Sequence, residues 1–292
     1  MATLTVFTPA YNRAYTLHKC YESLKRQTSK DFVWLIIDDG STDHTKELVS
    51  TWIEQNEIPI QYHYQQNQGM HGAHNTAYEL METELNVCID SDDYLTDWAI
   101  EKIIECWQKN KNPKLAGIAA LDGYSDIEVL GNRFPDNVKQ STYWDLYHKY
   151  QLRGDKKLIY RTDLMKKNSY PIFEGEKYVG LGYKYAKLDE EYELVTLNEI
   201  VCVVEYMEDG SSLNMFKQYV KNPRGFAFIR MEDMKNPRAS LGFKFKACVH
   251  YVSSSLIAKD KTFLRKSPLK GLTLLAFPFG CLLYLYVIKR AK

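Results

Sequence analysis

Residues 85–93, LNVCIDSDD, join a short apolar run to four polar residues, three of which are aspartates. The apolar part, Leu85–Ile89, has the length and composition of a buried β-strand. Similar runs occur at residues 4–8, 31–37 and 60–64, and segments with apolar residues at helical spacing separate them. Because strands alternate with helices of ordinary length, we predict βαβ units and an α/β fold with a mostly parallel sheet.

The alternation of strands and helices becomes looser after Leu121. Residues 212 to about 259 have helical spacing, interrupted before Pro223 and Pro237, because proline ends or bends a helix. The expected helices of the first third cover about residues 17–24, 48–53, 72–81 and 98–107, and further strands are expected at 116–121, 157–160, 192–197 and 201–206.

The chain has 292 residues and a formal net charge of +1, and 45% of its residues are hydrophobic. This composition excludes a disordered chain, a collagen and a coiled coil. The charge is uneven: residues 1–234 carry 26 basic and 36 acidic residues (−10), and residues 235–292 carry 12 basic and one acidic (+11). A basic tail of this kind favours an anionic partner, either nucleic acid or an anionic membrane.

Six cysteines are scattered along the chain, and none forms a CxxC pair. Several lie inside apolar runs. We therefore expect reduced, buried cysteines in a cytosolic protein, and neither a disulfide framework nor a zinc site.

Polar residues gather directly after the predicted strands, at the edge where parallel α/β sheets bind ligands. They include Tyr11, Asp39 and the aspartates of residues 90–93. The glycine-rich phosphate loops GxGxxG and GxxxxGK[ST] are both absent from this edge. Closely spaced carboxylates repel one another, but an Asp-x-Asp pair can hold Mg²⁺ or Mn²⁺ with water and a diphosphate completing the coordination.

Four segments in order resemble the motifs of the family 2 glycosyltransferases, which have the GT-A (Rossmann-like) fold. They are TVFTPAYNR (5–13), LIIDDGSTDHT (35–45), NQGMHGAHNTA (67–77) and VCIDSDDYL (87–95). The resemblance covers about the first 100 residues. It implies a nucleotide-sugar donor, usually UDP-linked, and transfer with inversion.

By this resemblance Pro9, Tyr11 and Asp39 would hold the nucleotide base and ribose. Asp90 and Asp92 match the Asp-x-Asp motif, and Asp92 is the expected direct ligand of Mn²⁺ or Mg²⁺.

The third segment matches the family pattern NxGxxxARN. Asn67, Gly69 and Asn75 would line the donor site. His74 takes the basic position, where relatives often have Arg or Lys, and imidazole is mostly neutral at pH 7.

The catalytic base in this family is a carboxylate well after the Asp-x-Asp pair, and it accepts the proton of the acceptor hydroxyl. Glu176 is our first candidate and Glu174 the second, and Asp155 is a weaker one. The alternative is that Glu174 and Glu176 are surface acids beside Lys177. Arg224 is interpreted as a solvated arginine near the start of a helix.

The QxxRW motif of processive relatives is absent, which predicts the addition of a single sugar. A lipid-linked or polymeric glycan is the expected acceptor. The expected context is bacterial surface-polysaccharide assembly, such as capsule or cell wall. The competing hypothesis is a catalytically inactive GT-A domain that serves as a membrane-bound partner in a glycan-assembly complex.

Residues 271–288 form an uncharged apolar run with Pro278 and Gly280 at its middle and basic residues on both sides. We predict a membrane-associating segment that kinks or breaks near Pro278, which fits a segment that dips into the bilayer and returns but leaves a full span open. The alternative is a buried C-terminal helix that closes the core of a soluble enzyme. The basic residues before the segment favour an anionic membrane surface over nucleic acid. Nucleotide sugars are made in the cytosol, so the cytoplasmic face is expected. The predicted organisation is a GT-A domain (1–210), a basic helical extension (211–268) and the hydrophobic segment (269–292).

Overall fold

The computed structural model describes residues 2–205 and 215–291, and its chain divides into two units. Unit one contains residues 1–67, 72–169 and 185–206, and unit two contains residues 68–71, 170–184 and 207–292. The boundary that we predicted at residues 210–211 lies outside the described residues.

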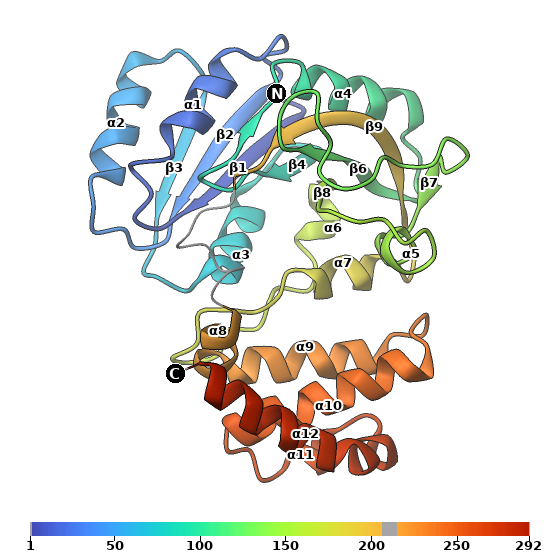
Figure 1. The fold of residues 1–292 in the computed structure, drawn as a ribbon. Helices are drawn as coiled ribbons and strands as arrows, with labels where there is room; N and C mark the ends of the chain where they lie inside the picture. The colour runs from blue at the N-terminus through green and yellow to red at the C-terminus, as the bar shows by residue number, and fades with distance from the viewer. Residues whose placement is uncertain (1, 206–214, 292) are drawn as a thin grey trace. The chain divides into compact units, whose positions relative to one another are not determined.

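A single mixed sheet forms the centre of unit one (Figure 1). Its strand order is β3-β2-β1-β4-β8-β6-β9-β5, and β7 pairs with β9. The pairs β3–β2, β2–β1, β1–β4 and β6–β9 are parallel, and β8 runs antiparallel between β4 and β6. The strands are β1 (Leu4–Ala10), β2 (Phe32–Asp38), β3 (Ile60–Tyr64), β4 (Leu85–Cys88), β5 (Tyr94–Leu95), β6 (Leu115–Gly123), β7 (Gln140–Ser141), β8 (Lys156–Arg161) and β9 (Glu193–Val203).

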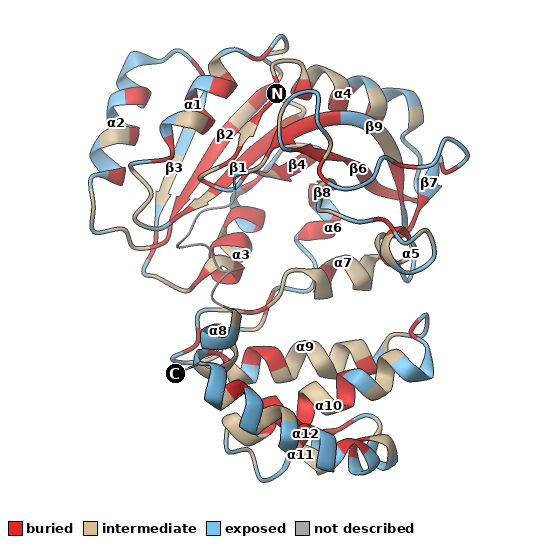
Figure 2. Cartoon of the chain, in the orientation of Figure 1, coloured by how far each residue is buried: buried red, intermediate tan, exposed pale blue. Residues whose placement is uncertain are grey.

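Helices cover both faces of this sheet. Alternate side chains of a strand point to opposite faces, so Val6 packs with helices α1, α2 and α4, while the ring of Phe7 packs against α3. Figure 2 shows the buried residues concentrated in the strands and on the inner sides of these helices. The helices are α1 (His18–Lys25), α2 (Thr45–Gln55), α4 (Ala99–Asn110), α5 (Tyr143–His148) and α6 (Thr162–Met165), and α3 (Met70–Leu80) and α7 (Gly182–Leu188) have residues in both units.

Strand β9 differs from the expectation of two strands at 192–197 and 201–206, because it is continuous from Glu193 to Val203. The polar residues that suggested a break form an irregularity in its pairing with β6. The amide of Asn198 there donates to the carbonyl of Phe134 and accepts from its N–H, at 2.8 and 2.9 Å. Side-chain bonding therefore satisfies a polar residue within a strand.

Unit two is helical over most of its described length. Its helices end near the prolines, as predicted: Asn222 precedes α9, and Asn236 follows it. Met234, Cys248, Tyr251 and Ala276 form a core that α9, α10 and α12 share. The helices are α8 (Met215–Lys221), α9 (Pro223–Lys235), α10 (Leu241–Ile257), α11 (Phe263–Lys266) and α12 (Lys270–Arg290).

Helix α12 corrects the prediction for the hydrophobic segment. It runs unbroken from Lys270 to Arg290 with Pro278 inside it, so the predicted break at the proline is wrong. Thr273, Ala276 and Gly280 are buried on one side, and Gly280 lies so close to α10 that a Cβ there would be 2.5 Å from Val252. Packing against α10 along its length explains how the helix continues through a proline that lies on its exposed side.

Candidate active site

Several of the predicted site residues of unit one lie at one edge of the sheet. Strands β1, β2 and β4 are parallel, and β6 runs in the same direction because both β4 and β6 are antiparallel to β8. Their carboxyl ends therefore share an edge. The residues placed there are Tyr11 after β1, Asp39 after β2, Asp90 after β4, and Asp122 near the end of β6.

Two loops at this edge hold each other in place. The N–H of Asn12 donates to Ser41 Oγ at 2.9 Å, and the Asn12 side chain accepts from the N–H of Thr42 at 2.7 Å. Asn12 has φ +54°, a conformation that asparagine tolerates better than most residues. These bonds fix the backbone directly after Tyr11, whose side chain is half exposed.

The two aspartates that end β2 have different environments. Asp38 accepts from the N–H of Ser41 at 2.7 Å and from the hydroxyl of Tyr62 at 2.5 Å, so its carboxylate holds the turn together. Asp39 is buried, and its Oδ1 accepts from Gln65 Nε2 at 2.7 Å. A fixed carboxylate after β2 can accept an N–H from a planar base, and the exposed ring of Tyr11 can stack on such a base.

Glycines allow close backbone contacts around the third motif. A Cβ on Gly40 would lie 2.9 Å from the backbone nitrogen of Asn67. Gly69 has φ +79°, and a Cβ there would lie 2.0 Å from the carbonyl oxygen of Lys177. Any other residue at Gly69 would therefore be strained and would clash.

His74 does not fit the diphosphate contact that we expected of it. Its side chain is fully buried, and its ring meets Phe7 edge-to-face at 5.0 Å and Tyr78 at 5.9 Å between centroids. A ring enclosed in this aromatic cluster packs α3 against the sheet. It therefore cannot stand in for a surface Arg or Lys.

The aspartates after β4 face different surroundings. Asp90 is exposed, Asp92 is partly exposed and Asp93 is buried. Asp93 Oδ1 accepts from the N–H of Glu205 at 3.0 Å. Burial, followed by the charges of neighbouring acids, raises the pKa of Asp93 to about 7 in spite of Lys157 nearby. Asp90 and Asp92 are thus the carboxylates of this turn that remain accessible to a ligand.

A divalent cation suits these two carboxylates. Mg²⁺ and Mn²⁺ prefer oxygen ligands, and Mg²⁺ is commonly bound by one or two carboxylates together with substrate phosphates. Among residues 2–205 and 215–291, groups of three or more His, Cys, Asp or Glu that could hold a metal are absent. A metal held by Asp90 and Asp92 would have to take its remaining ligands from a diphosphate and water.

Glu176 belongs to unit two, where it caps helix α9. Its Oε1 accepts from the backbone N–H and from Nε of Arg224, at 3.0 and 2.9 Å, and its Oε2 accepts from the N–H of Gly225 at 2.8 Å. The carboxylate is buried, and the N-terminus of a helix favours a negative charge. Three hydrogen bonds hold its two oxygens at the start of α9, away from bulk solvent.

The other candidate bases are more accessible. Glu174 is exposed, and its carbonyl oxygen accepts from Arg224 Nη2. Asp155 is exposed in unit one. Arg224 does lie at a helix start, as predicted, but it is half exposed and paired with Glu176.

Lys157 and Asp122 also lie at this edge of the sheet, although the sequence did not predict them as site residues. Lys157 lies near the start of β8, opposite Ala120 of β6, and its ammonium is close to Asp93 and Asp122. In the sequence, Lys157 is a lysine at the start of an apolar strand. Such a lysine usually lies on the surface, so this pattern could not identify it as a site residue.

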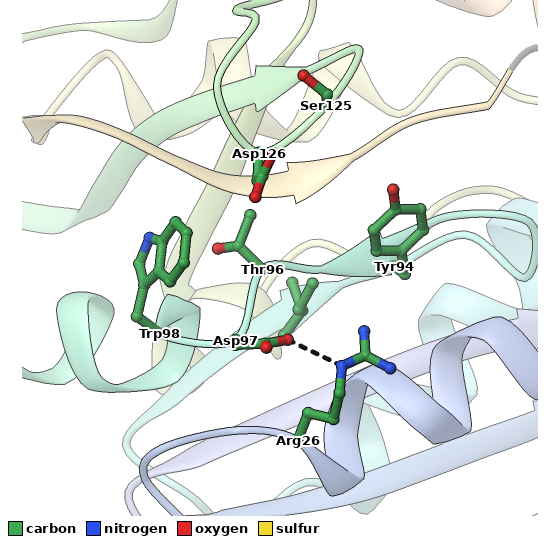
Figure 3. A pocket seen from close by; sticks show the side chains of 8 residues that line it. Arg26, Tyr94, Thr96, Asp97, Trp98, Ser125 and Asp126 are labelled. Atoms are coloured by element: carbon green, nitrogen blue, oxygen red, sulfur yellow. Dashed lines mark hydrogen bonds and ion pairs between the residues drawn. The ribbon is translucent and has the colours of Figure 1, made fainter.

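A cavity of about 270 Å³ is lined mainly by residues 94–98, which follow the turn after β4 in the sequence (Figure 3). Tyr94 and Trp98 stand on two sides of it, and Asp97 pairs with Arg26 at 3.0 Å. It contains none of the predicted site residues, so it does not coincide with the candidate site.

The family model for glycosyl transferase family 2 matches residues 5–164.

Glycosyltransferase GlyA of Streptococcus pneumoniae serotype 4 is 30% identical over 163 residues, which are 56% of this chain and 22% of the relative. The teichoic acid poly(glycerol phosphate) polymerase of Staphylococcus epidermidis is 35% identical over 106 residues, 36% of this chain and 15% of the relative. A Campylobacter jejuni GalNAc(5)-diNAcBac-PP-undecaprenol beta-1,3-glucosyltransferase is 31% identical over 134 residues, 45% of this chain and 41% of the relative. This chain thus spans less than half of each of these relatives.

Solved structures share the fold. S. aureus TarS 1-349 in complex with UDP-GlcNAc has a TM-score of 0.61 and 18% identity, covering 94% of this chain and 79% of that one. The mannosyltransferase PcManGT of Pyrobaculum calidifontis, with GDP-Man and Mn²⁺, has a TM-score of 0.57 and 16% identity, covering 99% and 76%. At these identities the likeness establishes the fold.

Proposed function

Because the chain belongs to glycosyl transferase family 2, we propose that it transfers one sugar from a UDP-sugar to a hydroxyl of a lipid-linked or polymeric glycan. The proposed transfer is metal-dependent, non-processive and inverting. The observation that carries the proposal is the common edge of unit one, which brings Tyr11, Asp39, Asp90 and Asp92 together. The relatives named for teichoic acid and undecaprenol-linked glycans support the acceptor class.

In this proposal the loops after β1 and β2 bind the nucleotide. The buried Asp39 carboxylate accepts the N–H of uracil, and Gln65 holds the carboxylate in place. The ring of Tyr11 stacks on the base, while Pro9, Asn67 and Asn75 line the remainder of the donor site. The solved structure of TarS with UDP-GlcNAc supports a UDP-linked donor.

Asp90 and Asp92 would hold the metal. When bound, Mn²⁺ or Mg²⁺ neutralises the diphosphate and makes it a better leaving group. The burial of His74 strengthens this part of the proposal, because the chain then offers no imidazole to the diphosphate at that position. The PcManGT structure with Mn²⁺ supports the choice of metal.

For the base we propose Glu174, with Glu176 as a positioning residue. Direct displacement needs a carboxylate that accepts the proton of the attacking hydroxyl. The exposed Glu174 has the freedom for this role, whereas Glu176 is bonded to the start of α9. Glu176 then holds the loop that carries Glu174, two residues away.

The membrane part of the proposal rests on α12. Among the described residues it is the one helix long and apolar enough to cross a membrane. One side packs in unit two, while Leu274, Leu275, Leu282 and Leu285 are each more than 60% exposed. A helix packed lengthwise on its neighbour, with leucines facing outward, is suited to lie in the plane of a membrane surface. We propose attachment to the anionic cytoplasmic face, where nucleotide sugars and lipid-linked acceptors meet.

A screen of nucleotide sugars tests the proposal. The purified chain is incubated with UDP-, GDP- and other nucleotide-linked sugars and Mn²⁺, and release of the free nucleotide is measured. Hydrolysis of one or a few UDP-sugars is expected. Binding of UDP without turnover of any donor or acceptor would favour the inactive membrane-bound partner instead.

A further inference from the structure

The ammonium group of Lys157 lies between two buried carboxylates at the proposed catalytic edge. Its Nζ is 3.9 Å from Asp93 Oδ2 and 3.6 Å from Asp122 Oδ1. The three side chains are 12%, 6% and 3% exposed, respectively. All three belong to unit one, on β8, on the turn after β4 and on β6.

Each of these acids needs a positive charge nearby. Burying an ionised carboxylate is costly unless it is paired or hydrogen-bonded. Asp93 has one backbone donor, the N–H of Glu205, and Asp122 Oδ1 has no hydrogen-bond donor in the described part of the chain. Burial raises the pKa of Asp122, whereas Asp122 and other nearby groups raise the pKa of Lys157 well above its usual value although burial opposes this.

The positive charge near these aspartates differs from the one that we expected from the sequence. Several aspartates at one edge suggested that only a divalent cation would offset their mutual repulsion. The structure instead places a lysine of the chain itself beside two of them. The exposed Asp90 and the partly exposed Asp92 lie in the same turn as Asp93.

We propose that Lys157 is the built-in counter-cation of the catalytic edge. It neutralises Asp93 and Asp122, keeps the turn after β4 in place without a metal, and leaves Asp90 and Asp92 to bind the cation that arrives with the donor. Lys157 is thus a positioning residue. The role of Asp90 and Asp92 in this inference rests on the proposed function, but the role of Lys157 does not require turnover.

Melting temperatures of the full chain at pH 8, in EDTA and in saturating Mn²⁺, test this inference. Lys157→Met should melt at least about 5 °C below wild type in EDTA, because two buried charges lose their partner. Mn²⁺ should then raise its melting temperature by more than it raises that of wild type, because the metal supplies the missing positive charge. Lys157→Arg should resemble wild type.

Two further variants separate charge from packing. Lys114→Met removes the same charge at an exposed site near the start of β6, and should melt like wild type with and without Mn²⁺. Lys157→Met/Asp122→Asn removes one charge of each sign, so its response to Mn²⁺ should return toward the wild-type value. If Lys157→Met does not fold, the double variant should still fold.

The inference is overturned if Mn²⁺ stabilises Lys157→Met no more than wild type, or if neither the single nor the double variant folds. Failure of the proposed function has a different signature. If wild type hydrolyses no nucleotide sugar and Lys157→Met still shows the larger response to Mn²⁺, only the proposed function fails.

Discussion

The Oε1 atom of Glu176 accepts hydrogen bonds from both the backbone N–H and the side-chain Nε of Arg224, at 3.0 and 2.9 Å. This places the acid that the sequence favoured as catalytic base at the start of helix α9, in an ion pair. The exposed neighbour Glu174 becomes the better candidate. Variants can distinguish the two glutamates, because Glu174 is expected to affect the rate of transfer and Glu176 the stability of the fold.

Glu174→Gln should lower kcat by about 10²–10⁴-fold, the usual cost of losing a general base, with an unchanged melting temperature. Glu176→Gln should lower the melting temperature, because it weakens a buried ion pair and a helix cap. Steady-state transfer rates and thermal melts of both variants check this. Full activity of Glu174→Gln, together with inactive but normally melting Glu176→Gln, would return the base to Glu176.

Tyr11→Ala should weaken UDP binding by about 5-fold or more, since stacking on a base contributes about 1–3 kcal/mol. Tyr11→Phe keeps the ring and should bind like wild type. Calorimetric titration with UDP and Mn²⁺ measures the difference. Tyr124→Ala, which removes another exposed tyrosine of unit one, serves as the control. Equal UDP affinity in Tyr11→Ala and wild type would exclude the stacking role.

Leu275→Glu/Leu282→Glu should reduce sedimentation with vesicles of anionic lipid, because both side chains lie on the exposed face of α12. Point variants are better suited to this test than truncation before α12, since Ala276 belongs to the core of unit two and its removal would expose α10. Donor hydrolysis in detergent should be unaffected. Pelleting of the double variant as complete as that of wild type would contradict attachment through this face.

Because His250 is difficult to protonate in the folded chain, we expect the folded chain to lose stability at acid pH. Burial, followed by the charges of Arg230 and Lys246, lowers its pKa to about 4. The unfolded chain takes up this proton near pH 6.5 and the folded chain does not until about pH 4, so stability falls as pH drops through this window.

Melting temperatures at pH 7.5 and pH 5 test this effect. His250→Gln should lose less stability between the two pH values than wild type does. His44→Gln, at an exposed position, should lose as much as wild type. An identical pH dependence in wild type and His250→Gln would show that this imidazole does not contribute.

Local patterns in the sequence predicted the first part of the fold well. The first four strands and helices, and the helices between residues 215 and 257, lie where apolar spacing and prolines placed them, because each has a clear period and a clear stop. Helix α12 is the exception, because it continues through Pro278. The family 2 resemblance and the α/β fold are confirmed. Strand β9 was split wrongly, because its polar Asn198 is satisfied by Phe134 of a distant loop.

The sequence could not predict the burial of His74 or the ion pairs of Lys157, because both depend on tertiary contacts. His74 occupies a motif position, yet its direction depends on Phe7 and Tyr78, which enclose it. Lys157 meets Asp93 and Asp122 only after β8 has paired with both β4 and β6. The roles of Asp39, Asp90 and Asp92 remain predictions, as does the choice between the glutamates.

Mn²⁺-dependent hydrolysis of a UDP-sugar, measured with wild type and with Asp92→Asn, decides whether the edge of unit one is a metal-dependent glycosyltransferase site. Asp92 is partly exposed beyond the end of β4, so Asp92→Asn should fold normally and lose activity. Asp126→Asn, which changes an acid of the separate cavity in Figure 3, should keep it. We expect wild type to release UDP in Mn²⁺. We expect no release by wild type in EDTA, and none by Asp92→Asn in Mn²⁺. Release by Asp92→Asn in EDTA at the wild-type rate would contradict this assignment.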